Sequence, residues 1–343
     1  MTRRAGAGEA PVPRKVRIVS GTDLAGLLTL ADVVPAVEAA YLAASRQDAL
    51  LYPVVREPLQ ASGGVFGIKS GYWPGHGTLG LKVAGYWPQN KKAGLENHQA
   101  TVVLVDPGTG VPAAILDGNF ITSIRTSAAG AIGLRCLARA DSATALIVGT
   151  GVQAEAQARA LGWWRHGLEL AVFEPLDTDD QSMARGFCER LTAQGITCRP
   201  AASLESAVRN VDIIVTTTPS TRPIVQRSWL RPGTHINAMG ADTAGKQEHA
   251  VATLRDALVV VDDWAQASRL GESQHAVRAG LFSDGDHPHS MGEVISEMAP
   301  GRNDHLQLTL FDATGLALQD LAAAELAARF AEERDAGRTI DLD

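Results

Sequence analysis

The segment that most constrains the fold is a short apolar run, residues 145–148, which ends in a Gly-Thr-Gly-Val-Gln turn and continues directly into a helical pattern. Glycines at such a turn let the backbone bend sharply and approach a pyrophosphate. The N-terminus of the following helix then stabilises the negative charge with its free N–H groups and its dipole. Ala154 replaces the third glycine of the G-x-G-x-x-G fingerprint, so the short motif is incomplete. Strand, turn and helix together predict a dinucleotide-binding unit.

An acidic residue at the end of the next strand supports this prediction. The second strand is predicted from Glu169 to Phe173 and is followed by Glu174, 25 residues after Gly149. At this place a carboxylate accepts hydrogen bonds from the adenosine ribose and repels the 2′-phosphate of NADP. We therefore expect a nicotinamide cofactor, and NAD rather than NADP.

Strands and helices alternate over residues 144–263, which is typical of a parallel sheet with helices on both faces. The predicted strands read ALIVG, ELAVF, ITCRP, DIIVTTT, THINAMG and ALVVVDD. The clearest helix is predicted over Asp179–Gln194, with Thr178 as its N-cap and Gly195 after its end.

The cofactor domain therefore lies in the middle of the chain, and the segments before and after it share a second domain. The Ala-rich C-terminal helix LQDLAAAELAARFAEER is too short to fold alone, so its apolar stripe is expected to pack on the N-terminal part or on a partner subunit. We predict an α/β protein with a central Rossmann-type parallel-sheet domain and a split α+β domain for substrate binding and dimerisation. The predicted division is a disordered tail at 1–15, the split domain at 16–125 and 313–343, and the NAD-binding domain at 126–312.

Composition excludes several other classes of protein. The 343 residues are 45% hydrophobic and 20% charged, with a net charge of −7, which gives no electrostatic footprint for nucleic acid. No apolar run is long enough to span a membrane, and three cysteines without C-x-x-C spacing suit a reducing, cytoplasmic location. The acidic loop Asp284–His289 has metal-like residue types, but such a Gly- and Pro-containing loop is more often only solvated, so we predict no metal site.

Two lysines are predicted to face each other in the N-terminal part. The segments GGVFGIKSGYW and TLGLKVAGYW are joined by the turn signal PGHG, and a hairpin centred between Gly75 and His76 places Lys69 opposite Lys82. Like charges on cross-strand partners are destabilising unless an anion lies between them. Lysines on a solvated sheet face are the alternative, but the apolar residues around them favour the wall of a pocket.

Long segments carry a resemblance to a known family. GLKVAGYWPQNKKAGLENHQATVVLVDPGTGVPAAILDGNFITSIRTSAAG, ALIVGTGVQAEAQ and INAMGADTAGKQE resemble the ornithine cyclodeaminase/mu-crystallin family from about Pro53 to Leu321. The resemblance implies a Rossmann domain, a split dimerisation domain, a homodimer, and chemistry at the α-amino or α-imino carbon with NAD(H) or NADP(H). Within the family, PVVREPL, FGIKSG, GYWPQN and GESQHA look most similar to the iminosuccinate reductases.

The matched motifs imply a set of site residues. Lys82 and Asp242 resemble the family's catalytic lysine and proton-transferring aspartate, and Arg56 the arginine that holds the substrate carboxylate. Arg125 matches the family's active-site arginine. Four cations, Arg56, Lys69, Lys82 and Arg125, are more than a monocarboxylate substrate needs, so we expect the substrate to be a dicarboxylate. His98 is either a pocket residue or a structural histidine. The residues predicted to contact the cofactor are Asn97, Arg125, Gly149, Gly151, Val152, Gln153, Glu174, Thr217, Met239 and Lys246.

The expected function is an NADH-dependent reduction of a small α-imino acid, with iminosuccinate as the leading substrate and L-aspartate as the product. One alternative is an ornithine or lysine cyclodeaminase, which recycles NAD, although Lys69 would oppose the second amino group of such a substrate. The other alternative is a non-catalytic, mu-crystallin-like protein that binds NADPH and a small ligand. Retention of Lys82, Arg125 and Asp242 argues against it, and Glu174 argues against NADPH.

Overall fold

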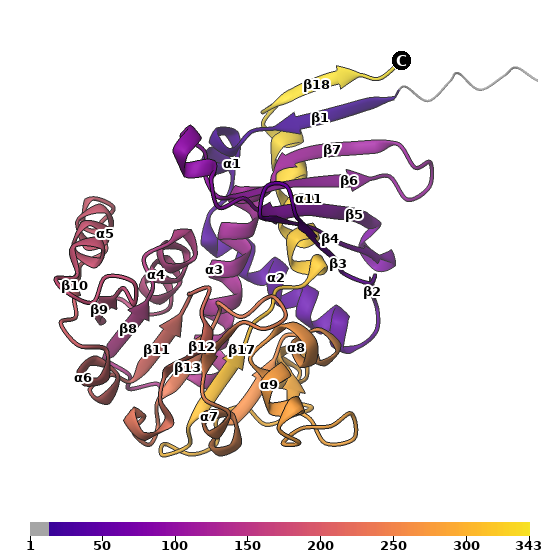
Figure 1. The fold of residues 1–343 in the computed structure, drawn as a ribbon. Coiled ribbons are helices and arrows are strands. Elements are labelled where there is room, and N and C mark those ends of the chain that lie inside the picture. The colour runs from indigo at the N-terminus through magenta and orange to yellow at the C-terminus, as the bar shows by residue number, and fades with distance from the viewer. Residues whose placement is uncertain (1–13) are drawn as a thin grey trace, which may run out of the picture.

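The computed structural model describes residues 14–343, in which two eight-stranded sheets are joined by a long helix (Figure 1). Residues 1–13 of the predicted disordered tail lie outside the described residues. The first strand already begins at Lys15.

The first sheet is mixed and has the order β18-β1-β7-β6-β5-β4-β2, with β3 paired to β4. Helix α11 packs against it and contacts β4, β5 and β6, while α2 packs on α11 and on α3 (Gly118–Leu137) (Figure 1). The predicted C-terminal helix is thus confirmed, and its apolar stripe lies on the N-terminal part. The elements of this part are β1 (Lys15–Val19), α1 (Gly21–Leu27), α2 (Leu30–Ser45), β2 (Leu50–Leu51), β3 (Val55–Leu59), β4 (Gly64–Trp73), β5 (Thr78–Tyr86), β6 (His98–Val105), β7 (Pro112–Asp117), α11 (Ala317–Glu333) and β18 (Arg338–Asp341).

The hairpin of β4 and β5 has the predicted register. The strands pair antiparallel around a short turn, Pro74–His76, and Lys69 lies directly opposite Lys82. Gly80, two residues before Lys82 on β5, faces helix α11, because a Cβ built there would meet Leu321. Alternate residues of a strand share a face, so both lysines point to the side of the sheet that α11 covers.

The second sheet is parallel throughout and has the order β10-β9-β8-β11-β13-β17-β15-β16. Its two faces are both buried: Ala145 and Ile147 of β8 join one apolar cluster, while Leu146 and Val148 join another. This arrangement is the predicted Rossmann-type sheet. Its strands are β8 (Thr144–Val148), β9 (Glu169–Phe173), β10 (Cys198–Pro200), β11 (Ile213–Thr216), β13 (His235–Ala238), β15 (Leu258–Val261), β16 (His289–Ser290) and β17 (Thr309–Asp312).

The helices of this part are mostly short. They are α4 (Val152–Trp164), α5 (Ser182–Ala193), α6 (Leu204–Arg209), α7 (Val251–Asp256), α8 (Trp264–Leu270), α9 (Ser273–Arg278) and α10 (Met291–Ile295), and a separate ribbon pairs β12 (Thr221–Val225) with β14 (Gln247–His249). The predicted start of the helix at Asp179 with Thr178 as N-cap is wrong. Helix α5 begins three residues later, because Gln181 has the left-handed φ of 54° and its side chain anchors the preceding loop.

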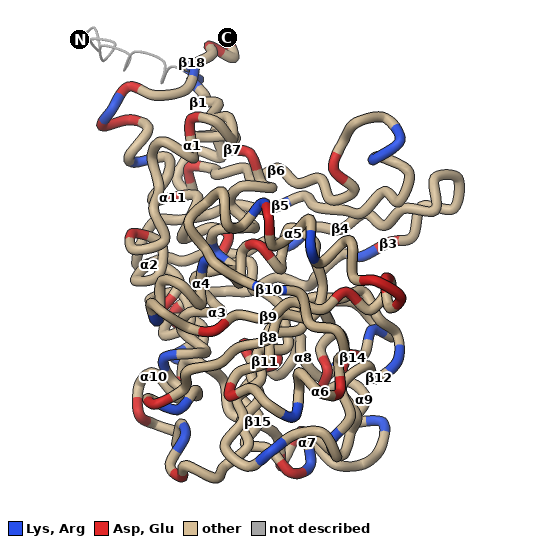
Figure 2. The backbone as a smooth tube through the Cα atoms, turned by 90° about the vertical axis from the view of Figure 1, so that its left-hand side faces the viewer, with Lys and Arg blue, Asp and Glu red and all other residues tan. Residues whose placement is uncertain are grey.

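Helix α3 (Gly118–Leu137) connects the two sheets and contacts β6 of the first and β13 and β17 of the second. The proposed domain boundary at 125/126 falls inside this helix, and the boundary at 312/313 falls at the end of β17. Figure 2 shows acidic and basic residues interspersed over the described chain. Among residues 14–343 no single helix is long and apolar enough to cross a membrane; by length and composition alone one pair, α1 and α2, bent by 94°, passes that test together.

Candidate active site

The predicted glycine turn connects β8 to α4 at the carboxyl edge of the parallel sheet. Gly149 has a φ of +114°, and a Cβ there would lie 2.6 Å from Oγ1 of Thr217, so only glycine fits without displacing that side chain. Gly151 is the N-cap of α4 and supplies no side-chain cap, and open space surrounds it. The side-chain oxygen of Gln153 is buried without a hydrogen-bond partner. The N–H groups at the start of α4 suit a bound pyrophosphate, and the side-chain oxygen of Gln153 can accept a hydrogen bond from a neighbouring group of the cofactor.

Glu174 lies beside this turn, as predicted. Its carboxylate is buried at the end of β9 and accepts hydrogen bonds from Thr150 Oγ1 at 2.7 Å and from the backbone N–H of Leu176 at 3.1 Å. The side-chain amide of Gln181 pairs with both backbone groups of Glu174, at 2.8 and 3.0 Å. The carboxylate is therefore held in place where the adenosine ribose of a dinucleotide would lie.

A buried group of three charges forms the floor of the site. Nζ of Lys82 lies 2.8 Å from Oδ1 of Asp320, and Nε of Arg125 lies 2.9 Å from the same oxygen. The three side chains come from β5, α11 and α3 and are each less than a tenth exposed. Lys82 also donates to Thr122 Oγ1 at 3.1 Å, whereas Oδ2 of Asp320 is buried and finds no partner among residues 14–343.

Burial sets the protonation behaviour of this group. It lowers the pKa of Lys82 to about 7, against the opposing effect of the Asp320 carboxylate, because a buried ammonium loses its hydration. Burial alone would raise the pKa of Asp320, but the charges of Lys82 and Arg125 outweigh it and lower that pKa. Lys82 can thus exchange a proton near neutral pH while Asp320 stays ionised.

Lys69 is held by a loop that follows the second sheet. Its ammonium donates to the carbonyls of Thr314 at 3.0 Å and Gly315 at 2.6 Å, which leaves one of its three N–H groups free. The loop itself is fixed by the carboxylate of Asp262, which accepts from Thr314 Oγ1 at 2.7 Å and from the Gly315 N–H. Gly315 has a φ of +77° and packs tightly against the Arg125 guanidinium, so a side chain there would collide with it.

Asp242 lies on the loop after β13 together with a lysine of the same loop. Its carboxylate is 2.6 Å from Nζ of Lys246 and 3.8 Å from Arg56, whose guanidinium also donates to Thr243 Oγ1 at 2.8 Å. Burial would raise the pKa of Asp242, but the charges of Lys246 and Arg56 outweigh it and lower that pKa well below its usual range. Nε of Arg56 is buried and has no partner in the described part of the chain, so the guanidinium retains a donor for a ligand.

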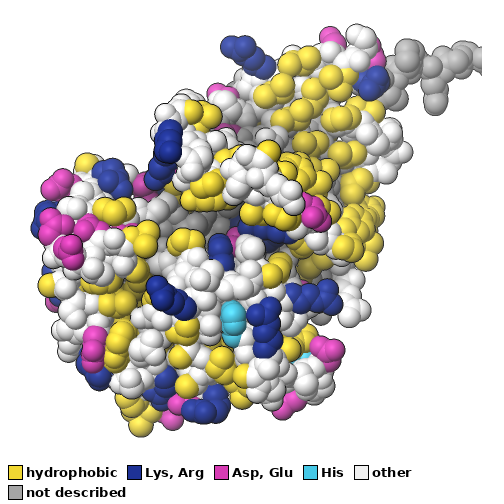
Figure 3. Space-filling view, in the orientation of Figure 1, with side chains coloured by type: hydrophobic (Ala, Val, Ile, Leu, Met, Phe, Trp, Pro, Cys, Tyr) yellow, Lys and Arg dark blue, Asp and Glu magenta, His cyan; other side chains and the backbone are white. Residues whose placement is uncertain are grey.

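The site carries an excess of positive charge. Among residues 14–343, two carboxylates, Asp242 and Asp320, pair directly with the five cations that meet there, and with Asp262 also ionised two positive charges remain uncompensated. Asp262 lies beneath the loop that holds Lys69, and burial raises its pKa to about 6. Figure 3 shows Lys and Arg side chains gathered in the hollow between the two sheet regions. The cations are Arg56, Lys69, Lys82, Arg125 and Lys246.

Of the remaining predicted cofactor residues, all but Asn97 lie near the glycine turn or the charged residues. Thr217 and Met239 follow β11 and β13 at the same sheet edge as the glycine turn, and Val152 is the first residue of α4. Asn97 is partly exposed and bonds within its own loop, to the Tyr86 hydroxyl and the Lys91 N–H. The structure therefore brings every predicted residue except Asn97 to the glycine turn or the charged cluster.

Two side chains that contact the charged group were not predicted from the sequence. Asp320 interrupts the apolar stripe of α11, and an acidic residue in such a stripe is a signal of a buried partner. Thr122, one turn before Arg125 on α3, carries no comparable signal.

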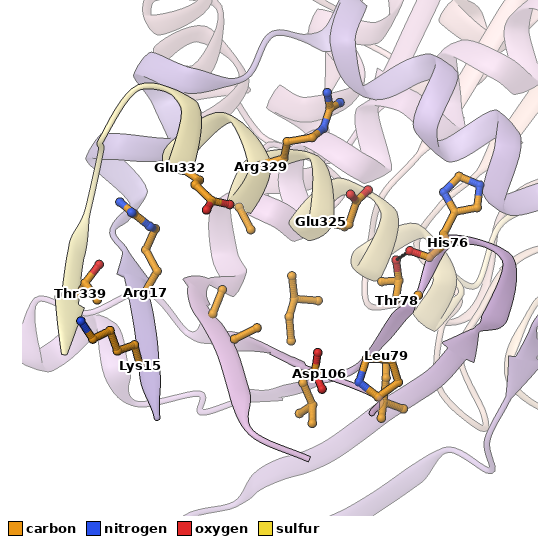
Figure 4. Close-up of a pocket in the computed structure, with 17 residues that line it drawn as sticks. Lys15, Arg17, His76, Thr78, Leu79, Asp106, Glu325, Arg329, Glu332 and Thr339 are labelled. Atoms are coloured by element: carbon orange, nitrogen blue, oxygen red, sulfur yellow. Dashed lines mark hydrogen bonds between the residues drawn. The ribbon is translucent and has the colours of Figure 1, made fainter. Parts of the chain in front are cut away.

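Other parts of the described chain are less suited to a catalytic site. A cavity of about 570 Å³ lies between α11 and the far end of the first sheet (Figure 4). Three of its basic side chains, Lys15, Arg17 and Arg329, already have carboxylate partners. In residues 14–343 no three His, Cys, Asp or Glu side chains are grouped to hold a metal ion. In the Asp284–His289 loop, His287 stacks on Trp264 and Asp284 accepts from its indole.

This combination defines a class of protein: a Rossmann-type domain whose cofactor edge faces a wall of lysine and arginine from a second sheet. The family model described as ornithine cyclodeaminase/mu-crystallin matches residues 15–334. The chain therefore belongs to the ornithine cyclodeaminase/mu-crystallin family, which confirms the resemblance predicted from its motifs.

Several relatives are similar over nearly their whole length. The iminosuccinate reductase of Paracoccus denitrificans is 34% identical over 325 residues, which cover 95% of this chain and 99% of that protein. Its crystal structure in complex with NAD⁺ has a TM-score of 0.87 and covers 96% of this chain and 100% of that one.

Two further solved structures are comparably similar. An archaeal alanine dehydrogenase, a dimer with bound NAD, is 34% identical with a TM-score of 0.88 and covers 96% of this chain and 100% of that one. The Thermococcus litoralis Δ1-pyrroline-2-carboxylate reductase in complex with NADH and L-proline is 29% identical with a TM-score of 0.89, covering 94% and 100%. All three relatives are named as reductases or dehydrogenases, and each was solved with NAD⁺, NAD or NADH.

Proposed function

We propose that this protein is an NADH-dependent reductase of a small α-imino acid, with iminosuccinate as the substrate and L-aspartate as the product. The excess of positive charge at the site is the observation that carries the proposal. Iminosuccinate has two carboxylates, whereas the imines of pyruvate and of proline have one. A site with more cations than carboxylates favours the doubly charged substrate over both.

The cofactor is proposed to be NADH, held by the glycine turn and by Glu174. The free N–H groups at the start of α4 suit the pyrophosphate, and the fixed Glu174 carboxylate suits the adenosine ribose hydroxyls. Asn97 is kept as a proposed cofactor residue, although its present bonds lie within its own loop. When bound, NADH supplies a hydride to the imine carbon.

The arginines and Lys69 are proposed to hold the substrate. Arg56 has a free Nε–H, and a guanidinium grips a carboxylate through two parallel hydrogen bonds. Lys69 has one free N–H and lies opposite Lys82, so it can hold the distal carboxylate of the substrate. Arg125 is fixed by Asp320 and directs its positive charge into the same space.

Lys82 is proposed to supply the proton at nitrogen. A group with a pKa of about 7 is well suited to donate a proton near neutral pH. Asp242 stays ionised beside Lys246, so we assign it to stabilising positive charge on the substrate nitrogen. Reduction thus uses Lys82 as acid and the surrounding cations for alignment.

The two alternative functions have weaker support. Lys69 disfavours a cyclodeaminase, because its charge would repel the second amino group of ornithine or lysine. Two ion pairs disfavour a protein that only binds a ligand: Lys82 with Asp320, and Lys246 with Asp242. A protein that only binds a ligand does not need a titratable lysine such as Lys82 in the floor of its pocket.

A homodimer is proposed from the outer face of the first sheet. This face points away from α11 and is formed by half-buried apolar side chains from three adjacent strands, such as Ile68, Leu81 and Val103. A broad apolar sheet face of this kind is typical of an interface with a second copy. Figure 3 shows hydrophobic side chains gathered over the first sheet.

The substitution Lys69→Met tests the substrate assignment. It is expected to raise KM for oxaloacetate with ammonium by roughly 10- to 100-fold, the scale of a lost hydrogen bond to a charged group, and to affect pyruvate with ammonium much less. Lys15→Met, which removes an exposed lysine far from the site, is the matched control. Equal losses for the two substrates would show that Lys69 supports only the fold.

A further inference from the structure

Helix α3 presents three polar side chains in a row to the charged floor of the site. Asn119, Thr122 and Arg125 are spaced by three residues, so they lie on one face of the helix. Each contacts a different group: Asn119 Oδ1 lies 3.0 Å from Nδ1 of His98, Thr122 accepts from Lys82, and Arg125 binds Asp320. His98 thus contacts the first residue of the same row, and the proposed catalytic lysine contacts the second.

The strand register places the imidazole on the same side as Lys82. His98 pairs with Tyr86, and Lys82 pairs with Val102 four residues further along β6. Alternate residues share a face of the sheet, so His98 and Lys82 both point toward α3. Asn119 precedes Thr122 by about one helical turn, so the helix side chains that contact the imidazole and the lysine ammonium are neighbours on one face.

The contact of His98 with Asn119 suits one tautomer of its ring. The amide oxygen of Asn119 lies 3.0 Å from Nδ1, which fits the tautomer with its hydrogen on Nδ1 and a lone pair at Nε2. Among residues 14–343, Nε2 has no hydrogen-bond partner. Burial lowers the pKa of His98, and the positive charge of Lys82 lowers it further, so the ring is neutral at pH 7.

We propose that Nε2 of His98 accepts a hydrogen bond from the nitrogen of the substrate. The inference rests on the proposed function, because it assumes an imino or amino acid in this pocket. The charged groups that face His98 are Lys82 on β5, Arg125 on α3 and Asp242 on the loop after β13. The two cations suit the carboxylates of the substrate, whereas a neutral acceptor suits an N–H group. His98 would thus distinguish an amino or imino acid from a carboxylic acid of the same shape.

Binding of two matched probes tests the assignment. L-aspartate and succinate are titrated into the enzyme loaded with NADH, which cannot oxidise the amine, since the two probes have the same carbon chain and two carboxylates and differ in the amino group. His98→Phe is expected to weaken L-aspartate binding roughly 10- to 100-fold, the scale of a hydrogen bond to a charged group, and to change succinate binding less than about threefold. NADH binding and the melting temperature should stay at the wild-type values.

A second variant tests the role of Asn119. In Asn119→Asp the new carboxylate favours a protonated imidazole, so Nε2 becomes a donor. L-aspartate should then bind more weakly than in wild type near neutral pH and recover as the pH rises and the ring loses its proton. A structural role alone would not produce this pH-dependent recovery.

His305→Phe, at an exposed histidine outside the site, is the matched control for His98→Phe.

The outcomes separate the two proposals. Equal weakening of L-aspartate and succinate in His98→Phe, or no weakening of either, would overturn the role of His98 while leaving the reductase assignment intact. A wild-type enzyme that binds succinate but not L-aspartate would instead overturn the substrate assignment, and the role of His98 with it.

Discussion

Replacing Asp320 by asparagine removes the one carboxylate that compensates two buried cations. The side chain is 1% exposed, and Oδ1 lies 2.8 Å from Lys82 and 2.9 Å from Arg125. Asparagine has nearly the same shape, so the change leaves no cavity and isolates the electrostatic effect. Breaking a buried ion pair by removing one partner costs about 3–5 kcal/mol, because an uncompensated charge stays buried. For a chain of 343 residues, a lowering of the melting temperature by roughly 4–7 °C is expected.

The same substitution should also change the pH profile. The Asp320 carboxylate raises the pKa of Lys82, so its loss moves that pKa below the wild-type value of about 7. Reduction needs the protonated lysine, so kcat/KM for imine reduction should fall as the pH rises through about 7 in wild type, and at lower pH in the variant. Oxidation of the amine should show the opposite dependence.

Thermal unfolding and pH-rate profiles measured on both proteins check this prediction. Glu325→Gln is the matched control, since it removes a partly exposed carboxylate from the same helix and should change the free energy of unfolding by less than about 0.5 kcal/mol. A variant with an unchanged melting temperature and an unmoved pH profile would refute the coupling of Asp320 to Lys82.

Three further predictions concern the cofactor turn and the catalytic loop. Glu174→Ala should reduce the preference for NADH over NADPH in kcat/KM, and an enzyme that favours NADPH before the substitution would contradict the role of this carboxylate. Asp242→Asn should lower kcat by about 100-fold or more, the scale of a lost electrostatic stabiliser, with little change in NADH affinity by fluorescence. Gly149→Ala should weaken NADH binding, because its Cβ would lie 2.6 Å from Thr217 Oγ1, and wild-type affinity would argue against the cofactor position.

Local sequence patterns were enough to predict the fold, the glycine turn with Glu174, and the facing lysines of the site. The cross-strand pairing of Lys69 and Lys82 follows from symmetry about one turn, and the glycine turn and Glu174 follow from strand ends. These features depend on residues close in the sequence or on a repeating architecture. The six strands predicted between residues 144 and 263 are present for the same reason.

The charge partners could not be predicted, because they depend on packing between distant elements. Asp320 lies 238 residues from Lys82 in the sequence, and only the docking of α11 on the first sheet brings them together. Asp262 fixes the loop whose carbonyls bind Lys69, and no spacing between residues in the sequence indicates this contact. The start of α5 was misplaced because Gln181, whose side chain supports Glu174, takes a left-handed conformation that its residue type does not predict.

The most direct test of the central claim is NADH oxidation by the purified enzyme with oxaloacetate and ammonium, compared with pyruvate and ammonium and with Δ1-pyrroline-2-carboxylate. The account predicts the highest kcat/KM with oxaloacetate and one L-aspartate formed for each NADH consumed. A higher kcat/KM with either monocarboxylate, or release of ammonia from ornithine or lysine without net consumption of NADH, would contradict it.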